Sequence, residues 1–227
     1  MNNIGIIFAM KEELDELLKL ANIKEIKKIY DLEFYICEIN NKKCTLVESG
    51  VGKVNSSRTT QVLIDNFDID VIINVGVAGG IDKNINVLDL VVSNKLVQHD
   101  FDISAFNHKK GYIPKIGDYL SVNNDLVKLC KKVDNNVKIG TIASGDAFIT
   151  DKDVSENINK EFNALCTDME SASIAQVAYL CNKPFIIIRC ISDTIYTGNN
   201  KITYEEFLSI SSKKVSKYLI KLLGELK

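Results

Sequence analysis

Short, continuous apolar runs alternate along this chain with segments of helical periodicity. Such runs predict strands that are buried on both faces, and strands separated by helices predict a mostly parallel sheet covered by helices on both sides. The expected strands span Ile4–Phe8, Asp70–Val75, Leu88–Val97, Val137–Ala143 and Pro184–Ile191. The expected helices span Lys11–Ala21, Val54–Phe67, Asp125–Val133, Met169–Cys181 and Thr203–Leu226.

A hairpin adds antiparallel character to this sheet. Two apolar segments, Phe34–Ile39 and Lys43–Glu48, flank a polar Asn-Asn-Lys turn, which predicts an antiparallel pair. The 227 residues include two prolines and no Pro/Ser-rich tract that could serve as a linker. We therefore expect an α/β fold, a three-layer αβα sandwich with a central mixed, mostly parallel sheet, in which residues 1–227 form a single domain.

Charge and cysteine content exclude several classes of function. The formal net charge of −2 argues against a nucleic-acid partner or an anionic membrane surface. No basic segment precedes the first apolar run, and no segment reaches the ~18–20 apolar residues of a membrane span. The six cysteines form no C-x-x-C pair, and neither His99 nor His108 has metal-ligand spacing. We expect a cytoplasmic protein with reduced thiols and no bound metal.

The segment from Thr167 to Thr194 carries a carboxylate near each outer end, Glu170 and Asp193. Its expected helix would run about 20 Å at ~1.5 Å per residue. Its expected strand would return a similar distance at ~3.3 Å per residue. Glu170, Ser192 and Asp193 should therefore lie at one edge of the sheet. In open α/β sheets, ligands bind at the edge formed by the carboxyl ends of the strands.

Each of these acids also has a purely structural interpretation. Thr167 and Glu170 fit a capping box at the start of the helix, although Glu170 precedes apolar residues at helical spacing. Asp193 could be an exposed aspartate after a strand, or a partner of Arg189. The four acids within residues 12–16 follow the first strand, where they would complement a helix macrodipole and stay solvated.

The ionisable residues favour acid–base chemistry by carboxylates. A Ser-His-Asp triad is not expected, because neither histidine has a matched nucleophile motif. One acid and one base acting on a bond is the arrangement of glycoside cleavage. The glycine segments Ser49–Val54 and Gly76–Gly80 match neither a Walker A nor a G-x-G-x-x-G motif. They do mark places where backbone can approach a ligand closely.

Eight segments, spread almost from end to end, carry a family resemblance. They read IGIIFAMKEELD, ESGVGKVNSS, DVIINVGVAGGI, HDFDISAF, SGDAFI, DMESASIAQVA, IIIRCISD and TYEEFL. Together they resemble the 5′-methylthioadenosine/S-adenosylhomocysteine nucleosidases of the nucleoside phosphorylase superfamily. The resemblance implies a nucleoside phosphorylase-like fold, no cofactor, and irreversible hydrolysis of a purine N-glycosidic bond that releases adenine and a 5-substituted ribose.

Matched position by position, the resemblance implies a role for each polar site residue. Glu13 would be the general base that activates water, with Arg189 ordering that water. Asp193 would protonate N7 of adenine, and Ser192 would position its carboxylate. Glu170 would bind the ribose hydroxyls.

The resemblance also implies residues that pack against the substrate or bind it through their backbone. They are Met169 near the sugar, Phe148 stacked on adenine, Ile149 with its backbone on the adenine edge, and Met10, Val51 and Tyr204 around the ribose and its 5′-substituent. Ile103 and Phe106 would reach into a neighbour's site, which implies a homodimer.

The chain departs from the family pattern at four positions. Phe8 and Leu88 replace glycines, and Asp168 replaces a glutamate. Val77 replaces a serine or threonine beside Glu13, which removes a hydroxyl that could orient Glu13 or the water. Phe8 would add bulk behind the site unless the strand turns it into the core.

Two other functions stay open at this stage. A phosphate-dependent purine nucleoside phosphorylase of the same fold would need a cationic phosphate pocket. Here the first loop, Lys11–Glu13, is acidic, and the chain has two arginines, Arg58 and Arg189. A non-catalytic adenosine-nucleoside-binding protein is favoured by Val77, whereas the presence of three candidate carboxylates together argues against it. The resemblance does not rank methylthioadenosine, S-adenosylhomocysteine, 5′-deoxyadenosine and futalosine-type nucleosides as substrates.

Overall fold

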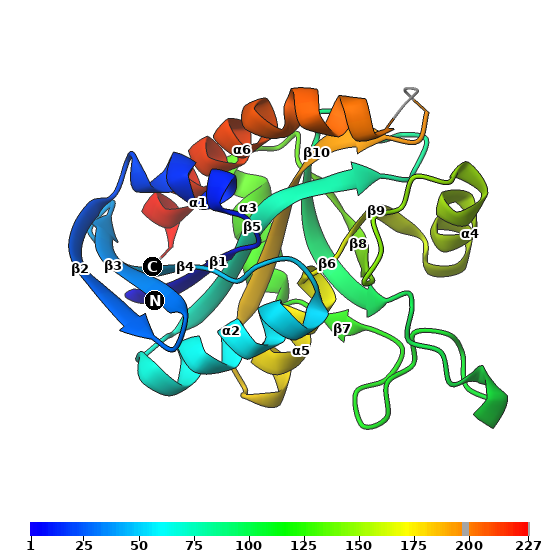
Figure 1. Cartoon of the computed structure of the whole chain (residues 1–227), viewed down its shortest axis with the longest axis horizontal. Helices are drawn as coiled ribbons and strands as arrows, with labels where there is room; N and C mark the ends of the chain where they lie inside the picture. The colour runs from blue at the N-terminus through cyan, green and yellow to red at the C-terminus, as the bar shows by residue number, and fades with distance from the viewer. Residues whose placement is uncertain (197–199, 227) are drawn as a thin grey trace.

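A computed structural model describes residues 1–196 and 200–226, with residues 200–205 described by their backbone alone. All named strands belong to one sheet (Figure 1). The strands are β1 (Asn3–Phe8), β2 (Asn22–Ile29), β3 (Leu32–Ile39), β4 (Lys42–Glu48), β5 (Val71–Gly80), β6 (Leu90–Gln98), β7 (Leu120–Ser121), β8 (Lys138–Ser144), β9 (Ala164–Asp168) and β10 (Phe185–Thr194). The helices are α1 (Lys11–Leu18), α2 (Lys53–Asn66), α3 (Asn124–Val133), α4 (Lys152–Phe162), α5 (Ser171–Leu180) and α6 (Asn200–Glu225), with a 3₁₀ turn at Ser104–Phe106.

The sheet consists of two parallel runs joined by antiparallel pairings. β4, β1, β5 and β10 form one parallel run, and β6, β8 and β9 form the other. β10 pairs antiparallel with β6, and β5 pairs antiparallel with β9. Because β10 also pairs with β5, the strands β10, β6, β8, β9 and β5 form a closed ring within the sheet. The expected mixed sheet is confirmed. Its closure brings the carboxyl ends of β5, β9 and β10 together.

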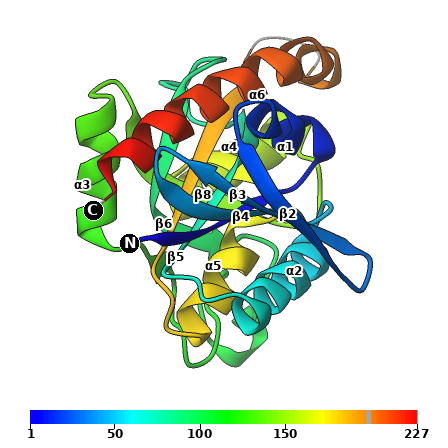
Figure 2. The same ribbon diagram turned by 90° about the vertical axis from the view of Figure 1, so that its left-hand side faces the viewer.

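Helices cover both faces of this sheet. α6 lies along β10 and contacts α1 and α3 on one face, whereas α2 packs against α5 on the other (Figures 1 and 2). All ten residues of β10 are buried, as expected for a strand covered on both faces. The expected layered α/β architecture is therefore confirmed. Among the described helices, none is both long and apolar enough to cross a membrane.

Sequence reasoning missed β2, β7, β9 and α4, together with the 3₁₀ turn at Ser104–Phe106. β2 is an edge strand with seven exposed residues out of eight, so no buried face marks it, and its lysines are typical of a protected edge. α4 did have a signal. Asp151 is its N-cap and accepts a hydrogen bond from the N–H of Val154 at 3.0 Å, which is the usual capping arrangement for an aspartate.

The end of β10 differs from expectation in a way that matters for the site. The strand continues to Thr194 instead of ending at Ile191. Its register against β5 shifts between Ile191 and Asp193, so Ser192 is the extra residue of a β-bulge. Bulges bend a strand and redirect its side chains, often beside active sites.

Two departures from the family pattern are absorbed by the fold. Phe8 is fully buried in the main hydrophobic cluster, so its bulk lies in the core and outside the site. Leu88 has a φ of 71°, which is the left-handed region that a glycine adopts at little cost. Leu88 therefore keeps a glycine-like backbone and tolerates its strain.

Candidate active site

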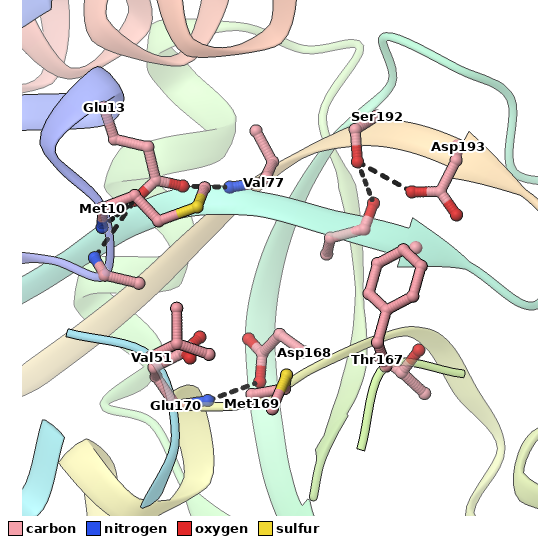
Figure 3. A pocket seen from close by; sticks show the side chains of 14 residues that line it. Met10, Glu13, Val51, Val77, Thr167, Asp168, Met169, Glu170, Ser192 and Asp193 are labelled. Carbon is pink, nitrogen blue, oxygen red and sulfur yellow. Dashed lines mark hydrogen bonds between the residues drawn. The ribbon is translucent and has the colours of Figure 1, made fainter. Parts of the chain in front are cut away.

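A cavity of about 320 Å³ lies at the carboxyl ends of β5, β9 and β10 (Figure 3). Other parts of its wall come from the start of α1 and from the loop between β4 and α2. The residues predicted from the sequence that line it are Met10, Glu13, Val51, Val77, Phe148, Met169, Glu170, Ser192 and Asp193. The expectation that Glu170, Ser192 and Asp193 meet at one edge of the sheet is confirmed.

Glu13 lies in the first turn of α1 and is 2% exposed. Its carboxylate accepts hydrogen bonds from the N–H groups of Ala9, Met10 and Val77 at 3.1, 3.2 and 2.9 Å. The expectation of a solvated acid is therefore wrong for Glu13. Burial raises the pKa of Glu13, while the charge of Arg189 and the three N–H groups oppose that rise.

The carboxylate of Glu13 is oriented by backbone on the β5 side. Val77 contributes its N–H to Oε1, so a side-chain hydroxyl is not needed there to orient Glu13. The neighbouring Gly76 leaves the space that the carboxylate occupies. A Cβ atom at Gly76 would lie 2.7 Å from Oε1 of Glu13 and 3.1 Å from Nη1 of Arg189.

Arg189 lies beneath the cavity and is 1% exposed. Its Nε donates to Oδ2 of Asp168 at 2.8 Å, and its Nη2 donates to Oδ1 of Asn74. Asp168 also accepts a hydrogen bond from the hydroxyl of Ser144 at 2.6 Å. This buried guanidinium is therefore paired and hydrogen-bonded, as a buried charge must be. The interpretation of Asp193 as the partner of Arg189 is wrong.

Glu170 is the N-cap residue of α5, but its side chain does not cap the helix. Oδ1 of Asp168 does so, because it accepts from the N–H groups of Glu170 and Ser171 at 3.3 and 3.2 Å. The predicted capping box of Thr167 and Glu170 is therefore wrong. The Glu170 carboxylate lines the cavity instead, and its Oε1 accepts from the N–H of Gly52 at 2.9 Å.

Glu170 is buried among charges of both signs. Burial raises the pKa of Glu170 to about 7, and the charges of Asp168 and Glu13 add to that rise. Arg189 and the N–H of Gly52 act in the opposite direction. A positive charge on a bound ligand would therefore be stabilised beside Glu170.

Asp193 lies on β10, on a different side of the cavity from Glu13 (Figure 3). It is 2% exposed, so the interpretation as an exposed loop residue is wrong. Its carboxylate accepts a hydrogen bond from the hydroxyl of Ser192 at 2.8 Å. Burial raises the pKa of Asp193 to about 6, and the bond from Ser192 opposes the rise. Gly79 on β5 leaves room for this carboxylate, because a Cβ atom there would lie 3.3 Å from Oδ2 of Asp193, which is a tight contact.

Four predicted residues within the described part of the chain do not line the cavity. Arg189 lies beneath it, and Ile149 follows Phe148, which lines the cavity and is 48% exposed. Ile103 and Phe106 belong to residues 101–119, which we call the arm. Its 3₁₀ turn projects from the body (Figure 1), and Phe106 is 76% exposed. The side chain of Tyr204 lies outside the described residues.

A metal site was not expected from the sequence. Within residues 1–196 and 206–226, no three side chains of His, Cys, Asp and Glu are grouped as potential metal ligands. The chemistry that the lining itself offers is that of its carboxylates.

Known proteins are similar to this chain over nearly its whole length. Residues 3–224 match the Phosphorylase superfamily. A 5′-methylthioadenosine/S-adenosylhomocysteine nucleosidase of Staphylococcus haemolyticus is 39% identical, over 97% of this chain and 100% of the relative. The structure of the nucleosidase of the same name from Helicobacter pylori with butyl-thio-DADMe-Immucillin-A has a TM-score of 0.94 at 35% identity and covers 100% of this chain and 99% of that one. A futalosine hydrolase of Helicobacter pylori has a TM-score of 0.94 at 34% identity, over 99% and 98% of the two chains.

Proposed function

The chain belongs to the 5′-methylthioadenosine/S-adenosylhomocysteine nucleosidase family of the phosphorylase superfamily, and we propose that it hydrolyses the N-glycosidic bond of one or both of these nucleosides. The products are adenine and a 5-substituted ribose. One observation carries the proposal, namely a single cavity with the buried carboxylates Glu13 and Asp193 on different sides. An acid and a base on two sides of a bond are what its hydrolysis requires.

In this proposal Glu13 is the general base. Its three N–H donors hold the carboxylate in one orientation, from which it can accept a proton from water as that water attacks the sugar. The guanidinium of Arg189, which contributes to the electrostatics of Glu13 from below, helps to order this water. Fixed donors of this kind cost no reorganisation during the reaction.

Glu170 binds the ribose hydroxyls and stabilises positive charge on the sugar. Oε1 is engaged by Gly52, which leaves Oε2 available to the substrate. The transition state of glycoside cleavage resembles an oxocarbenium ion, so the negative charge of Glu170 favours it over the neutral ground state. Met169 packs near the sugar, and Met10 and Val51 line the side that receives the 5′-substituent.

Asp193 is the general acid that protonates N7 of the leaving adenine. A pKa of about 6 leaves a useful protonated fraction near neutral pH, which an ordinary aspartate lacks. Ser192 positions this carboxyl group. Phe148 stacks on the base from the open side of the cavity, and the backbone of Ile149 bonds the adenine edge.

Phosphorolysis is less well supported than hydrolysis. A phosphate nucleophile needs cationic partners, but the described residues that line the cavity include no lysine or arginine. Arg58 is an exposed residue paired with Asp31, and Arg189 is paired with Asp168. A non-catalytic binding protein is also less well supported, because the orientation of Glu13 does not depend on the hydroxyl that Val77 lacks.

The working form in this proposal is a homodimer. Ile103 and Phe106 lie on the projecting arm, and an exposed phenylalanine is suited to burial against a partner. In the dimer these two residues close the 5′ side of the neighbour's cavity. Analytical ultracentrifugation should give the mass of two chains. Phe106→Ala should raise KM, while its sedimenting mass should remain that of the unmutated protein.

The proposed compartment and domain organisation follow the sequence expectations. All six cysteines are free thiols and five of them are buried, which is consistent with the reducing cytoplasm. One continuous sheet and one main hydrophobic cluster support a single domain over residues 1–227.

The decisive experiment measures base release from methylthioadenosine, S-adenosylhomocysteine, 5′-deoxyadenosine and a futalosine-type nucleoside, with and without phosphate. We expect adenine release from at least one of the first two without phosphate. Strict dependence on phosphate would show that the reaction is phosphorolysis. Tight binding of all four without turnover would instead favour a binding protein. The order of kcat/KM values identifies the preferred 5′-substituent.

A further inference from the structure

The start of α2 receives two carboxylates from distant parts of the chain. The N–H of Gly52 donates to Glu170, and the N–H of Lys53 donates to Oδ1 of Asp146 at 2.8 Å. α2 has no acid in its own first turn, and Gly52, its N-cap, offers no side chain. Because the first N–H groups of a helix need acceptors from elsewhere, the position of this loop depends on these two carboxylates.

Three residues close a ring of hydrogen bonds beside this loop. Lys53 Nζ contacts Oδ1 of Asp100 at 2.7 Å, and Oδ2 of Asp100 accepts from the N–H of Asp146 at 3.0 Å. Asp146 in turn accepts from the N–H of Lys53. Each residue thus contacts the other two, and we call Lys53, Asp100 and Asp146 the clasp. None of them lines the cavity.

The clasp joins the segments that carry the proposed substrate contacts. Gly52 precedes Lys53 in the chain, the arm begins after Asp100, and Phe148 follows Asp146 by two residues. Lys53 also donates to Oε1 of Gln98 at 3.2 Å, and Gln98 donates to Gln176 of α5 at 2.6 Å. The ring is therefore tied to the helix whose N-cap is Glu170.

The clasp is partly shielded from water, and its surroundings favour the ionised form of Asp100. The side chains of Lys53 and Asp100 are 20% and 33% exposed. Burial acts to raise the pKa of Asp100, but the bonds from Lys53 and from the N–H of Asp146 outweigh it and hold this pKa below its usual range. Nearby His99 has its pKa lowered by burial, so it adds little positive charge at neutral pH.

We propose that Lys53, Asp100 and Asp146 are positioning residues for substrate binding, because their ring holds the N–H of Gly52 against Glu170 and ties that contact to the Phe148 loop and the arm. The proposal rests on the proposed function, in which Glu170 binds ribose. It gives a role at the site to Asp100 and Asp146, neither of which lines the cavity.

The test begins with Lys53→Met, which removes the ammonium and keeps the stem. We expect KM for the preferred nucleoside to rise about tenfold with a smaller change in kcat, since a hydrogen bond to a charged group is weakened. Lys53→Arg should retain most of the affinity. The matched control is Lys132→Met, which breaks an ion pair of similar length, 2.6 Å to Glu225, between α3 and α6. It should leave KM unchanged.

A pH profile separates positioning from general loosening of the fold. The N–H of Gly52 lowers the pKa of Glu170, so its loss should raise that pKa further. The ratio of kcat/KM for Lys53→Met to that of the unmutated enzyme should then be lowest at low pH and recover at high pH, where Glu170 is ionised in both proteins. The other charged groups that face Glu170 are Asp168 from β9, Arg189 from β10 and Glu13 from α1, and Lys53→Met leaves all three in place. A ratio that does not change with pH, together with an unchanged KM, would overturn the proposal.

A double-mutant cycle distinguishes failure of the clasp from failure of the proposed function. The dissociation constant of a non-hydrolysable methylthioadenosine analogue is measured for Lys53→Met, Glu170→Gln and the double variant. Action through Glu170 predicts that Lys53→Met costs less than about twofold once Glu170 is replaced. Full additivity overturns the clasp alone, and an unchanged dissociation constant in Glu170→Gln overturns the ribose assignment. If Lys53→Met fails to fold by circular dichroism, Asp100→Asn takes its place in the cycle.

Discussion

The two ends of the cavity hold their carboxylates by different means. Glu13 accepts three backbone N–H groups and lies near the guanidinium of Arg189, whereas Asp193 accepts the hydroxyl of Ser192 on a bulge of β10 (Figure 3). A backbone N–H can only donate, so it always favours the ionised carboxylate. A hydroxyl can donate to the carboxylate or accept from the protonated acid.

Burial raises the pKa of both groups, so burial alone does not distinguish acid from base. The partners make the difference. At Glu13 a positive charge and three fixed donors oppose protonation, and at Asp193 one rotatable hydroxyl does. Two carboxylates whose surroundings differ in this way are suited to opposite roles. Substitutions at each end of the cavity test this contrast.

The largest effects are expected from Glu13→Gln and Asp193→Asn. Each should lower kcat/KM by about 10²–10⁴-fold, the usual contribution of general acid–base catalysis. A 4-nitrophenyl riboside tells the two apart, because its leaving group departs without a proton. Asp193→Asn should recover most activity with this substrate, and Glu13→Gln should not. Equal recovery in both variants, or in neither, would contradict the division of roles.

An intermediate effect is expected from Ser192→Ala, which removes the hydroxyl that lowers the pKa of Asp193. The unmutated enzyme should show a bell-shaped kcat/KM profile, because the reactive form needs a protonated Asp193 and Asp193 loses its proton as pH rises through about 6. In Ser192→Ala that pKa rises, so the ratio of its kcat/KM to that of the unmutated enzyme should increase as pH rises above about 6. The maximum should fall up to about tenfold as the carboxyl group is positioned less well.

The control for this variant is Ser93→Ala on β6. Ser93 is also fully buried, and no described residue hydrogen-bonds its hydroxyl. Its pH profile should match that of the unmutated enzyme. A ratio for Ser192→Ala that does not increase with pH would mean that Ser192 does not act on the proton of Asp193.

The smallest effect is expected from Val77→Ser, which restores the hydroxyl of the family pattern. Because the N–H of Val77 already orients Glu13, kcat/KM should change by less than about threefold, within the range of one weak hydrogen bond. Steady-state kinetics at the pH optimum measure this change. A gain of a hundredfold would show that backbone donors alone position Glu13 poorly and that the contrast between the two ends is overstated.

The sequence predicted the strand order along the chain well because most strands are buried on both faces. Their continuous apolar runs mark β1, β5 and β10 clearly. β2 has no such face, since it lies at the edge of the sheet and is exposed. The short β9 pairs with a strand on each side, but its five residues offer too few positions for periodicity to show.

Most side chains that line the candidate site were predicted but their contacts were not, and Asp168, which also lines the cavity, was not assigned to it. Geometry placed Glu170 and Asp193 together, and the family resemblance added Glu13. The capping pattern of Thr167 and Glu170 misled, because Asp168 caps α5 in place of Glu170. No local pattern identifies Asp168 as the partner of Arg189, since the two meet only through adjacent parts of the folded sheet.

By itself, the sequence determined the alternation of strands and helices, the family, and three of the carboxylates that line the cavity, Glu13, Glu170 and Asp193. These depend on residue type and order, and the residues carry them directly. Only the tertiary structure decided what each carboxylate contacts. Glu13 meets Val77 across 64 residues, and Glu170 meets Gly52 across 118. A carboxylate's pKa depends on burial and on the donors around it, and both exist only once the sheet has closed and brought distant segments together.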